Sequence, residues 1–482
     1  MGMQDHFQNA FFIGGEWVAP SSKKQFKLIN ATTEEEIASV PEAVEADVDR
    51  AVAAARKAFD HSGWATSTPA ERAEVMGRFI AALQKRSGQI ARTVSLQNGM
   101  PLALSEPFEG GLSIGLLDYY RQLAAGPQAD DIRPSQVGVE TVVSRNPVGV
   151  VAAIVPWNFP VTLALSKIGP AMAAGCTVVI KPSPGTILDS YLLAQAAEEA
   201  KVPPGVINWV AADREVGAYL VSHPGIDKVA FTGSTSAGRI IARTCGELLR
   251  PVTLELGGKS AAIILDDANL DNVMIGLQSA SLLNNGQACF NCTRVLAPQS
   301  QYDRVVEAVG AMIRGLKVGD PMDASTQIGP MASSLHRDRV EGYIAKGKAE
   351  AKLIAGGGRP KGLDRGWFVE PTVFAGLDNN ATIAREEIFG PVLAVIPYKD
   401  EAEAVRIAND SEFGLGGSVW SADSGRARKL AQGVHTGTIG INGYVPSVGS
   451  PFGGVKASGL GRELGPEALG AYQQYKSTYV MG

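Results

Sequence analysis

The N-terminal part of the chain carries apolar and polar residues at the spacing of amphipathic helices. From residue 43 to about 125, apolar side chains recur every three to four positions and would gather on one face of a helix. The pattern predicts one helix within 43–59 and a second within 68–99. Pro69 suits the first turn of the second helix, and Gly99 lies just beyond its last turn.

Strand patterns begin after a short polar stretch. The segment VGVETVVSRNPVGVVAAIVPWNFP (137–160) predicts a strand, a turn at Asn146-Pro147 and a second strand that is apolar throughout. Such a strand is typical of the interior of a parallel sheet, because both of its faces are covered. Helices and strands then alternate, and the alternation restarts after LELGGKS and continues to about residue 445. This order predicts an α/β protein with a Rossmann-like sheet and a second α/β domain.

Composition fits two domains and excludes several classes of function. The 482 residues are 45% hydrophobic, which is enough for more than one core. The net charge of -5 and the absence of a Lys/Arg-rich run argue against nucleic acid or an anionic membrane as a partner. The chain has no signal-peptide pattern, no apolar run of about 18 residues and too few cysteines for a disulfide scaffold. We therefore expect a soluble, cytoplasmic protein.

Residues at predicted strand ends are candidates for ligand binding and catalysis. Gly233 and Ser234 precede a helix whose free N–H groups could face a phosphate, although an ordinary capped turn has the same pattern. Lys181 ends an apolar strand, where either a ligand contact or a solvated lysine is expected. Glu255 lies between apolar residues before a Gly pair. It is either a desolvated general base with a raised pKa or a strand glutamate that faces solvent.

The segment NNGQACFNCTR (284–294) contains Cys289 and Cys292, two of the four cysteines. A structural zinc site needs four ligands, but no second CxxC and no histidine cluster is present in the sequence, so we expect no metal. A thioredoxin-like redox pair would follow the first strand of a small domain, whereas this pair follows a helical segment deep in the chain. A single nucleophilic cysteine is favoured, with a buried bystander as the alternative.

The chain resembles the aldehyde dehydrogenase superfamily over nearly its whole length. The 34 residues from Glu255 to Cys289 match the family's spacing from general base to nucleophile. Seven motifs carry the resemblance, in the family's order: PWNFP (156–160), KPSP (181–184), FTGST (231–235), LELGGKS (254–260), NNGQAC (284–289), EEIFGPV (386–392) and PFGGVKASGLGRE (451–463).

The resemblance implies oxidation of an aldehyde to a carboxylic acid with NAD(P)+, through a thiohemiacetal and a thioester on Cys289. Glu255 matches the general base that activates water. Asn158 matches the amide that stabilises the oxyanion together with the Cys289 backbone N–H. Lys167 matches a lysine that supports the oxyanion and proton-transfer region, and Glu463 matches a carboxylate implicated in proton relay.

The resemblance also implies a cofactor site and a substrate pocket. Lys181 matches a ligand of the adenosine ribose, Gly233 and Ser234 line the pyrophosphate, Glu387 holds the nicotinamide ribose, Phe389 packs by the nicotinamide, and Trp157 belongs to the cofactor site. The implied pocket walls are Phe159, Ser166, Leu283, Ala288, Phe290 and Phe452. Several relatives have a bulky aromatic residue where Ser166 stands, so the pocket is expected to be wider or more polar on one side. A medium-sized apolar or aromatic aldehyde fits best.

Pro184 departs from the pattern of many NAD-preferring relatives, which have a glutamate there that hydrogen-bonds the ribose 2′-hydroxyl. Without that carboxylate nothing repels a 2′-phosphate, so NADP stays open as an alternative. We expect NAD, because no Arg or Lys beyond Lys181 is evident there to bind the phosphate.

The family's fold implies three parts. Residues 1–125 and 147–256 would form the cofactor-binding domain, 257–456 the catalytic domain, and 126–146 with 457–482 an oligomerisation arm and C-terminal segment. A homodimer or homotetramer is expected.

Two other functions and one further role stay open from the sequence. A CoA-acylating semialdehyde dehydrogenase typically lacks the base glutamate, so Glu255 argues against it. A catalytically silent binding protein on the same fold would tolerate loss of Cys289, Glu255 or Asn158, yet all three are present. Cys292 would either capture oxidised Cys289 as a disulfide or be a buried apolar residue.

Overall fold

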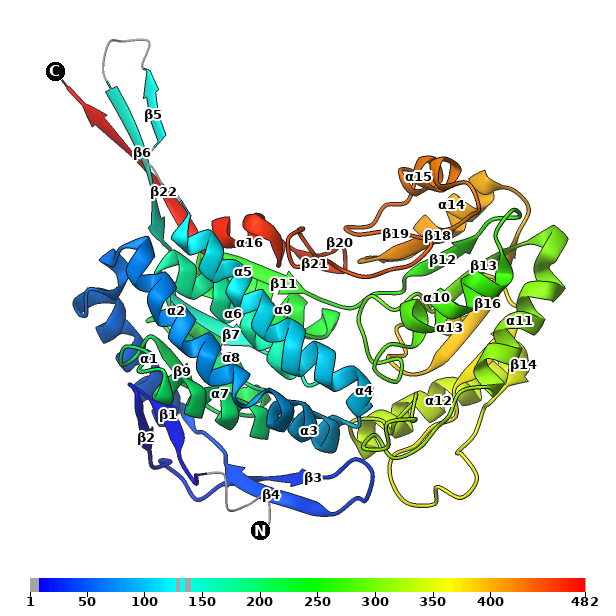
Figure 1. Ribbon diagram of the computed structural model, residues 1–482, viewed down its shortest axis with the longest axis horizontal. Helices are drawn as coiled ribbons and strands as arrows, with labels where there is room; N and C mark the ends of the chain where they lie inside the picture. The colour runs from blue at the N-terminus through cyan, green and yellow to red at the C-terminus, as the bar shows by residue number, and fades with distance from the viewer. Residues whose placement is uncertain (1–7, 127–130, 135–139, 482) are drawn as a thin grey trace.

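Two large sheets, each covered by helices, form two lobes, and a narrow three-stranded arm projects from the first lobe (Figure 1). The computed structural model describes residues 8–126, 131–134 and 140–481. The α/β architecture therefore agrees with the sequence pattern.

The first sheet has a Rossmann-like core of five parallel strands, β9-β8-β7-β10-β11, with antiparallel strands at both edges. Numbered along the chain, the parallel strands lie in the order 3-2-1-4-5, so the order reverses between β7 and β10. Across the sheet the strands are β2 (Glu16–Val18), β1 (Phe11–Ile13), β9 (Ile207–Trp209), β8 (Thr177–Lys181), β7 (Val150–Ile154), β10 (Lys228–Thr232), β11 (Val252–Glu255) and β21 (Gly459–Leu460).

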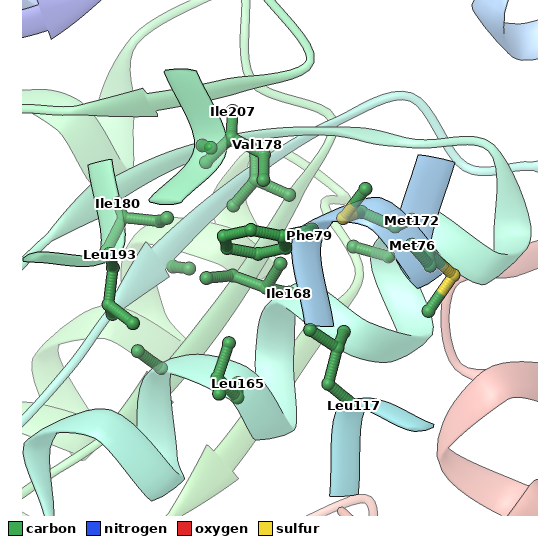
Figure 2. Close-up of a cluster of buried hydrophobic side chains, with 14 of the residues drawn as sticks. Met76, Phe79, Leu117, Leu165, Ile168, Met172, Val178, Ile180, Leu193 and Ile207 are labelled. Atoms are coloured by element: carbon green, nitrogen blue, oxygen red, sulfur yellow. The ribbon is translucent and has the colours of Figure 1, made fainter. Parts of the chain in front are cut away.

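Helices cover both faces of this sheet, because the parallel strands are buried on both sides. One face packs against α2, α5, α6 and α7, where Figure 2 shows the ring of Phe79 among side chains from the neighbouring helices and strands. The other face packs against α1, α8 and α9. The helices of this lobe are α1 (Glu45–His61), α2 (Pro69–Gln84), α3 (Ser87–Asn98), α4 (Leu102–Ser105), the π-helix η3 (Glu106–Leu112), α5 (Ser113–Ala125), α6 (Pro160–Ala174), α7 (Leu188–Glu199), α8 (Arg214–Ser222) and α9 (Thr235–Glu247), with the 3₁₀ turn η2 (Trp64–Thr66).

Two boundaries differ from the sequence prediction. The single helix expected within 68–99 is broken into α2 and α3 at Lys85 and Arg86, just before a Ser87-Gly88 step. Both residues at the break pair with Glu199 at the end of α7, so tertiary contacts hold a turn that the Ser87-Gly88 step signals only weakly. The turn expected at Asn146-Pro147 lies at residues 148–149 instead, because strand β6 extends through Pro147 and β7 begins at Val150.

The second sheet is parallel except for one edge strand, β14, and separates two further apolar cores. Its strands are β14 (Lys352–Ala355), β15 (Thr372–Ala375), β16 (Val392–Tyr398), β13 (Arg294–Pro298), β12 (Ala261–Ile264), β18 (Gly417–Trp420) and β19 (Gly440–Ile441). The helices of this lobe are α10 (Leu270–Leu282), α11 (Tyr302–Arg314), α12 (Ser334–Glu350), α13 (Thr382–Arg385), α14 (Glu401–Asn409) and α15 (Ser424–Ala431), with the 3₁₀ turn η4 (Gln299–Gln301).

The C-terminal segment returns to the first lobe. Its strand β21 pairs with β11, and its last strand joins the arm in the order β22-β6-β5. Of the arm expected over 126–146, residues 127–130 and 135–139 lie outside the described residues. The remaining elements are β22 (Gln473–Val480), β6 (Glu140–Pro147), β5 (Asp131–Pro134), α16 (Gly465–Gly470) and two small antiparallel sheets, β3 (Gln25–Ile29) with β4 (Glu36–Pro41) and β17 (Phe413–Gly414) with β20 (Val455–Lys456).

Candidate active site

A cleft of about 620 Å³ opens at the carboxyl ends of β7 and β10. These strands flank the point where the strand order reverses, which is where open α/β sheets bind ligands. Both lobes line the cleft. It brings together eight of the predicted site residues: Trp157, Asn158, Gly233, Ser234, Glu255, Cys289, Glu387 and Phe389.

Cys289, the predicted nucleophile, is half-buried on the loop between α10 and β13. Burial raises the pKa of its thiol, and the negative charges of Glu255 and Glu387 raise it further. The loop lies close to Gly258, where a Cβ would come within 2.4 Å of the Cys289 carbonyl oxygen. A glycine at 258 therefore allows the nucleophile loop to approach the segment that follows Glu255.

Asn158, the predicted oxyanion donor, follows β7 and is buried at the cleft. Its side-chain N–H donates to the Gln287 carbonyl oxygen at 3.0 Å, two residues before the nucleophile. Two other amides hold its backbone, because Asn98 Nδ2 (3.1 Å) and Asn284 Nδ2 (2.9 Å) both donate to the Asn158 carbonyl oxygen. The sequence analysis gave these two residues no role. The signal available was the Asn-Gly pattern that begins at each of them, because such patterns mark left-handed backbone conformations.

Glu255, the predicted general base, ends β11 and is only 2% exposed. Neither of its carboxylate oxygens has a hydrogen-bond partner among the described residues. Burial raises its pKa well above the usual range, and the charge of Glu463 raises it further, whereas Lys167 and Arg462 act in the opposite direction. At Gly453 a Cβ would lie 2.5 Å from Glu255 Oε1, so only glycine leaves room for this carboxylate.

A buried ion pair lies near Glu255. Lys167 of α6 contacts Glu463 with an Nζ to Oε1 distance of 2.7 Å, and its Nζ also donates to Thr232 Oγ1 at 2.7 Å. The Ser166 hydroxyl donates to the other carboxylate oxygen of Glu463 at 2.9 Å. Ser166 was predicted as a pocket wall, but the structure places its polar group against Glu463.

Glu387, the predicted ribose ligand, is held by the Gly pair that follows Glu255. The Gly258 N–H donates to Glu387 Oε1 at 2.9 Å, and a Cβ at Gly257 would come within 2.4 Å of Oε2. Burial raises the pKa of Glu387. The Gly pair therefore lets a carboxylate from the second lobe reach the end of the first sheet.

Phe389, the predicted nicotinamide contact, and Trp157, a predicted cofactor-site residue, belong to an aromatic cluster. Phe389 adopts a left-handed backbone conformation (φ 64°), and its ring lies 5.4 Å from that of Trp157. His336, which the sequence did not indicate, contacts both rings, and its Nε2 lies 2.6 Å from the Phe389 carbonyl oxygen. Burial lowers the pKa of His336 to about 4, so the ring is neutral near pH 7 and donates this hydrogen bond.

Two predicted cofactor residues lie apart from the cleft lining. Lys181 is buried at the end of β8, and its Nζ donates to the backbone oxygens of Pro182 and Ala212 at 2.8 and 2.9 Å. Burial lowers the pKa of Lys181 to about 8. Pro184 is half-buried in the turn that follows.

The remaining pocket residues form an apolar, aromatic wall. Phe290 packs edge-on against Phe452 and against Tyr444, which the sequence did not indicate. Phe159 packs against Phe108 at a centroid distance of 6.0 Å. Ala288 belongs to the same core as Phe159, and Leu283 and Phe290 pack against that core.

Cys292 lies in an apolar core of the second lobe. Its side chain is fully buried, and its Sγ accepts a hydrogen bond from Ser418 Oγ at 3.6 Å. Burial raises the pKa of this thiol to about 12. These contacts favour a buried apolar residue over a redox partner of Cys289.

The described part of the chain lacks two other kinds of feature. No group of three or more His, Cys, Asp or Glu side chains there is arranged to hold a metal ion. No helix there is long and apolar enough to cross a membrane.

Comparisons with known proteins agree on one family. The model of the aldehyde dehydrogenase family matches residues 17–478. The chain is 59% identical to geranial dehydrogenase of Castellaniella defragrans, with 98% of each chain covered, and 42% identical to 3-succinoylsemialdehyde-pyridine dehydrogenase of a Pseudomonas species, again with 98% of each covered. A crystal structure of Mycobacterium tuberculosis aldehyde dehydrogenase complexed with NAD+ superimposes with a TM-score of 0.96 at 46% identity, with 98% of both chains covered. A mutant of Pseudomonas syringae aldehyde dehydrogenase C, complexed with NAD+ and octanal, gives a TM-score of 0.94 at 38% identity, covering 97% of this chain and 96% of that one.

The buried carboxylate of Glu255 predicts a pH-dependent stability difference. Because its pKa is raised in the folded state, folding favours the protonated form, and stability falls as pH rises from about 4.3 toward the folded pKa. Glu255→Gln keeps the shape and removes the ionisation. We expect its Tm to exceed that of the wild type by about 2 to 6 °C at about pH 8, and by less at about pH 5. Thermal denaturation at both pH values tests this. If Glu255→Gln instead had a lower Tm than the wild type at about pH 8, burial of the ionised Glu255 carboxylate would not destabilise the folded protein.

Proposed function

The chain belongs to the aldehyde dehydrogenase family and oxidises aldehydes to carboxylic acids, and we propose that its substrate is geranial or an apolar aldehyde of similar shape. The observation that carries the chemistry is the meeting of Cys289, Glu255 and Asn158 at one cleft. The substrate class is supported by the aromatic wall around Phe290 and by the 59% identity to geranial dehydrogenase. An apolar wall favours a hydrocarbon chain over a charged one, because burying a charge without a partner is costly.

Cys289 acts as the nucleophile in this proposal. In its thiolate form its Sγ bonds to the aldehyde carbon, and the carbonyl oxygen becomes the alkoxide of a thiohemiacetal. The Asn158 amide and the Cys289 backbone N–H donate to that oxygen, and one such donor contributes about 3 kcal/mol in comparable oxyanion holes. Asn98 and Asn284 support this role, because they fix the backbone that carries the Asn158 amide.

Glu255 acts as the general base that releases the product. A carboxylate with a raised pKa accepts a proton near neutral pH more readily than an ordinary glutamate. The proton comes from the water whose oxygen attacks the thioester carbon, and the bond to Cys289 Sγ then breaks to give the acid. The buried pair of Lys167 and Glu463 offers a path for that proton away from Glu255. In sum, aldehyde, water and NAD+ give carboxylic acid, NADH and a proton.

The cleft residues fit a nicotinamide dinucleotide. A buried carboxylate, Glu387, suits the hydroxyls of a ribose, and the N-terminus of α9 beside Gly233 and Ser234 suits a pyrophosphate. The flat rings of Trp157 and Phe389 suit the nicotinamide. When bound, the nicotinamide supplies a hydride acceptor and a positive charge that favours a thiolate nearby. Lys181 uses two of its three Nζ hydrogens on backbone oxygens, which leaves the third for a hydroxyl of the adenosine ribose.

The arm formed by β5, β6 and β22 supports a homodimer or homotetramer. Its described side chains are mostly exposed, including Ile132, Tyr475 and Tyr479, and both of its edge strands leave backbone groups free to pair. We propose a cytoplasmic homo-oligomer with small-molecule ligands and no nucleic-acid partner, consistent with the acidic net charge.

The substrate proposal is tested with a panel of aldehydes. Purified enzyme with NAD+ is given geranial, octanal and betaine aldehyde, and NADH is followed by absorbance, with Cys289→Ala as the inactive control. We expect kcat/KM for geranial to exceed that for betaine aldehyde by about 100-fold or more, because geranial buries a longer hydrocarbon chain against the aromatic wall and has no ammonium group to desolvate. Higher kcat/KM for betaine aldehyde would overturn the substrate proposal. Acid formation without CoA also distinguishes this function from the CoA-acylating alternative.

Cofactor preference is tested at Pro184. A glutamate at this position would place a carboxylate near the 2′-position of the adenosine ribose, where it repels a phosphate and accepts a hydrogen bond from a hydroxyl. We expect Pro184→Glu to lower kcat/KM for NADP+ by about tenfold and to leave that for NAD+ unchanged or higher. Initial rates with each cofactor at saturating aldehyde provide the measurement. Unchanged NADP+ kinetics would mean that residue 184 does not face the ribose.

A further inference from the structure

Glu109 is a buried carboxylate that the proposed reaction leaves without a role. It lies in the π-helix η3 and is 0% exposed. Its Oε2 accepts hydrogen bonds from the Val161 N–H at 2.7 Å and the Thr162 N–H at 3.4 Å, and its Oε1 accepts from the Thr162 hydroxyl at 2.5 Å. The carboxylate is therefore fully committed to the first turn of α6, more than 50 residues along the chain.

Helix α6 lacks a cap of its own. Pro160 at its first position has no N–H, and the N-cap residue Phe159 makes no side-chain cap hydrogen bond. The free N–H groups of the first turn thus need an acceptor from elsewhere, and a negative charge there also interacts favourably with the helix dipole. Glu109 supplies both. Burial raises its pKa to about 7, but the hydrogen bonds from α6 favour the ionised form.

The π-helix is shaped to deliver this carboxylate. Its Gly110 lies so close to α3 that a Cβ there would come within 2.9 Å of the Ser87 carbonyl oxygen. Phe108, on the other side of Glu109, accepts a hydrogen bond from the Thr162 hydroxyl and packs against Phe159. Two consecutive residues of η3 therefore contact the start of α6, and π-helical turns of this kind are frequent at functional sites.

The residue held by this contact is Asn158, which lies directly before the Phe159 N-cap. On its other side, the Asn158 backbone is fixed by Asn98 and Asn284. We propose that Glu109 is a positioning residue, which fixes the start of α6 so that the Asn158 amide points at the oxyanion. This role rests on the proposed function, because it requires Asn158 to act as the oxyanion donor.

A double-mutant cycle tests this proposal, with kcat/KM measured for wild type, Glu109→Ala, Asn158→Ala and the double variant. Loss of an oxyanion donor costs about 10²- to 10³-fold, and a misplaced donor up to about 10²-fold, so we expect Glu109→Ala to lower kcat/KM by about 10- to 100-fold. In the Asn158→Ala background the same change should cost less than about threefold, because the donor that it positions is gone. The proposal would be overturned if the fold-loss in kcat/KM of the double variant equalled the product of the two single losses, since Glu109 would then act independently of Asn158.

Asp47→Asn is the matched control. Asp47 is also 0% exposed and accepts hydrogen bonds from backbone N–H groups near the start of α1, on the opposite face of the first sheet. We expect it to lower Tm while keeping kcat/KM within about twofold of wild type. A loss of kcat/KM as large as that of Glu109→Ala would trace both effects to general destabilisation and defeat the proposal. If Glu109→Ala does not fold, Glu109→Gln takes its place in the cycle, with an expected loss of about 3- to 10-fold.

The substrate proposal and the positioning role fail separately. The cycle is run with octanal as well as geranial, so an enzyme that oxidises octanal but not geranial overturns only the substrate. If the losses of kcat/KM from Glu109→Ala and Asn158→Ala multiply with every aldehyde that the enzyme oxidises, only the positioning role is overturned.

Discussion

Burying the Glu255 carboxylate without a hydrogen-bond partner among the described residues is the constraint on which the rest of the site depends. An ionised carboxylate is unfavourable in a buried site without hydrogen-bond donors. The charges near Glu255 therefore decide whether its carboxylate ionises and serves as a base or stays protonated. The fold places Glu463 close enough to raise the pKa of Glu255 and Lys167 close enough to limit that rise. Glycine at 453 leaves the space that the carboxylate fills.

The two-lobed fold brings this base to the nucleophile. Glu255 ends the last parallel strand of the first sheet, whereas Cys289 lies on a loop of the second lobe. The Gly257-Gly258 pair between the lobes allows close contact with both Glu387 and the carbonyl oxygen of Cys289. Side chains at these two positions would push the second lobe away from the first sheet. The glycines therefore set the width of the cleft in which the two lobes meet.

The fold class and the candidates Gly233, Ser234, Glu255 and Cys289 followed from local patterns, since apolar strands and Gly-rich turns are signalled within short stretches. The other four predicted residues that line the cleft followed from the resemblance to the family: Trp157, Asn158, Glu387 and Phe389. The features that the sequence did not indicate are contacts between residues that lie far apart in the chain. The break between α2 and α3 depends on Glu199, and the hydroxyl of Ser166 turns to Glu463, nearly 300 residues away. Asn98 and Glu109 support the Asn158 segment only because folding brings three helices together. No spacing rule predicts such contacts.

The division of labour between Glu255 and Cys289 is the central claim, and pre-steady-state formation of NADH tests it most directly. Wild type, Glu255→Gln and Cys289→Ala are each mixed with saturating aldehyde and NAD+, and NADH is followed from the first turnover. If Glu255 only activates the hydrolytic water, Glu255→Gln gives a burst of about one NADH per active site and then a weak steady rate, whereas Cys289→Ala gives none. Absence of a burst in Glu255→Gln would contradict the account, because Glu255 would then be needed to deprotonate the thiol as well.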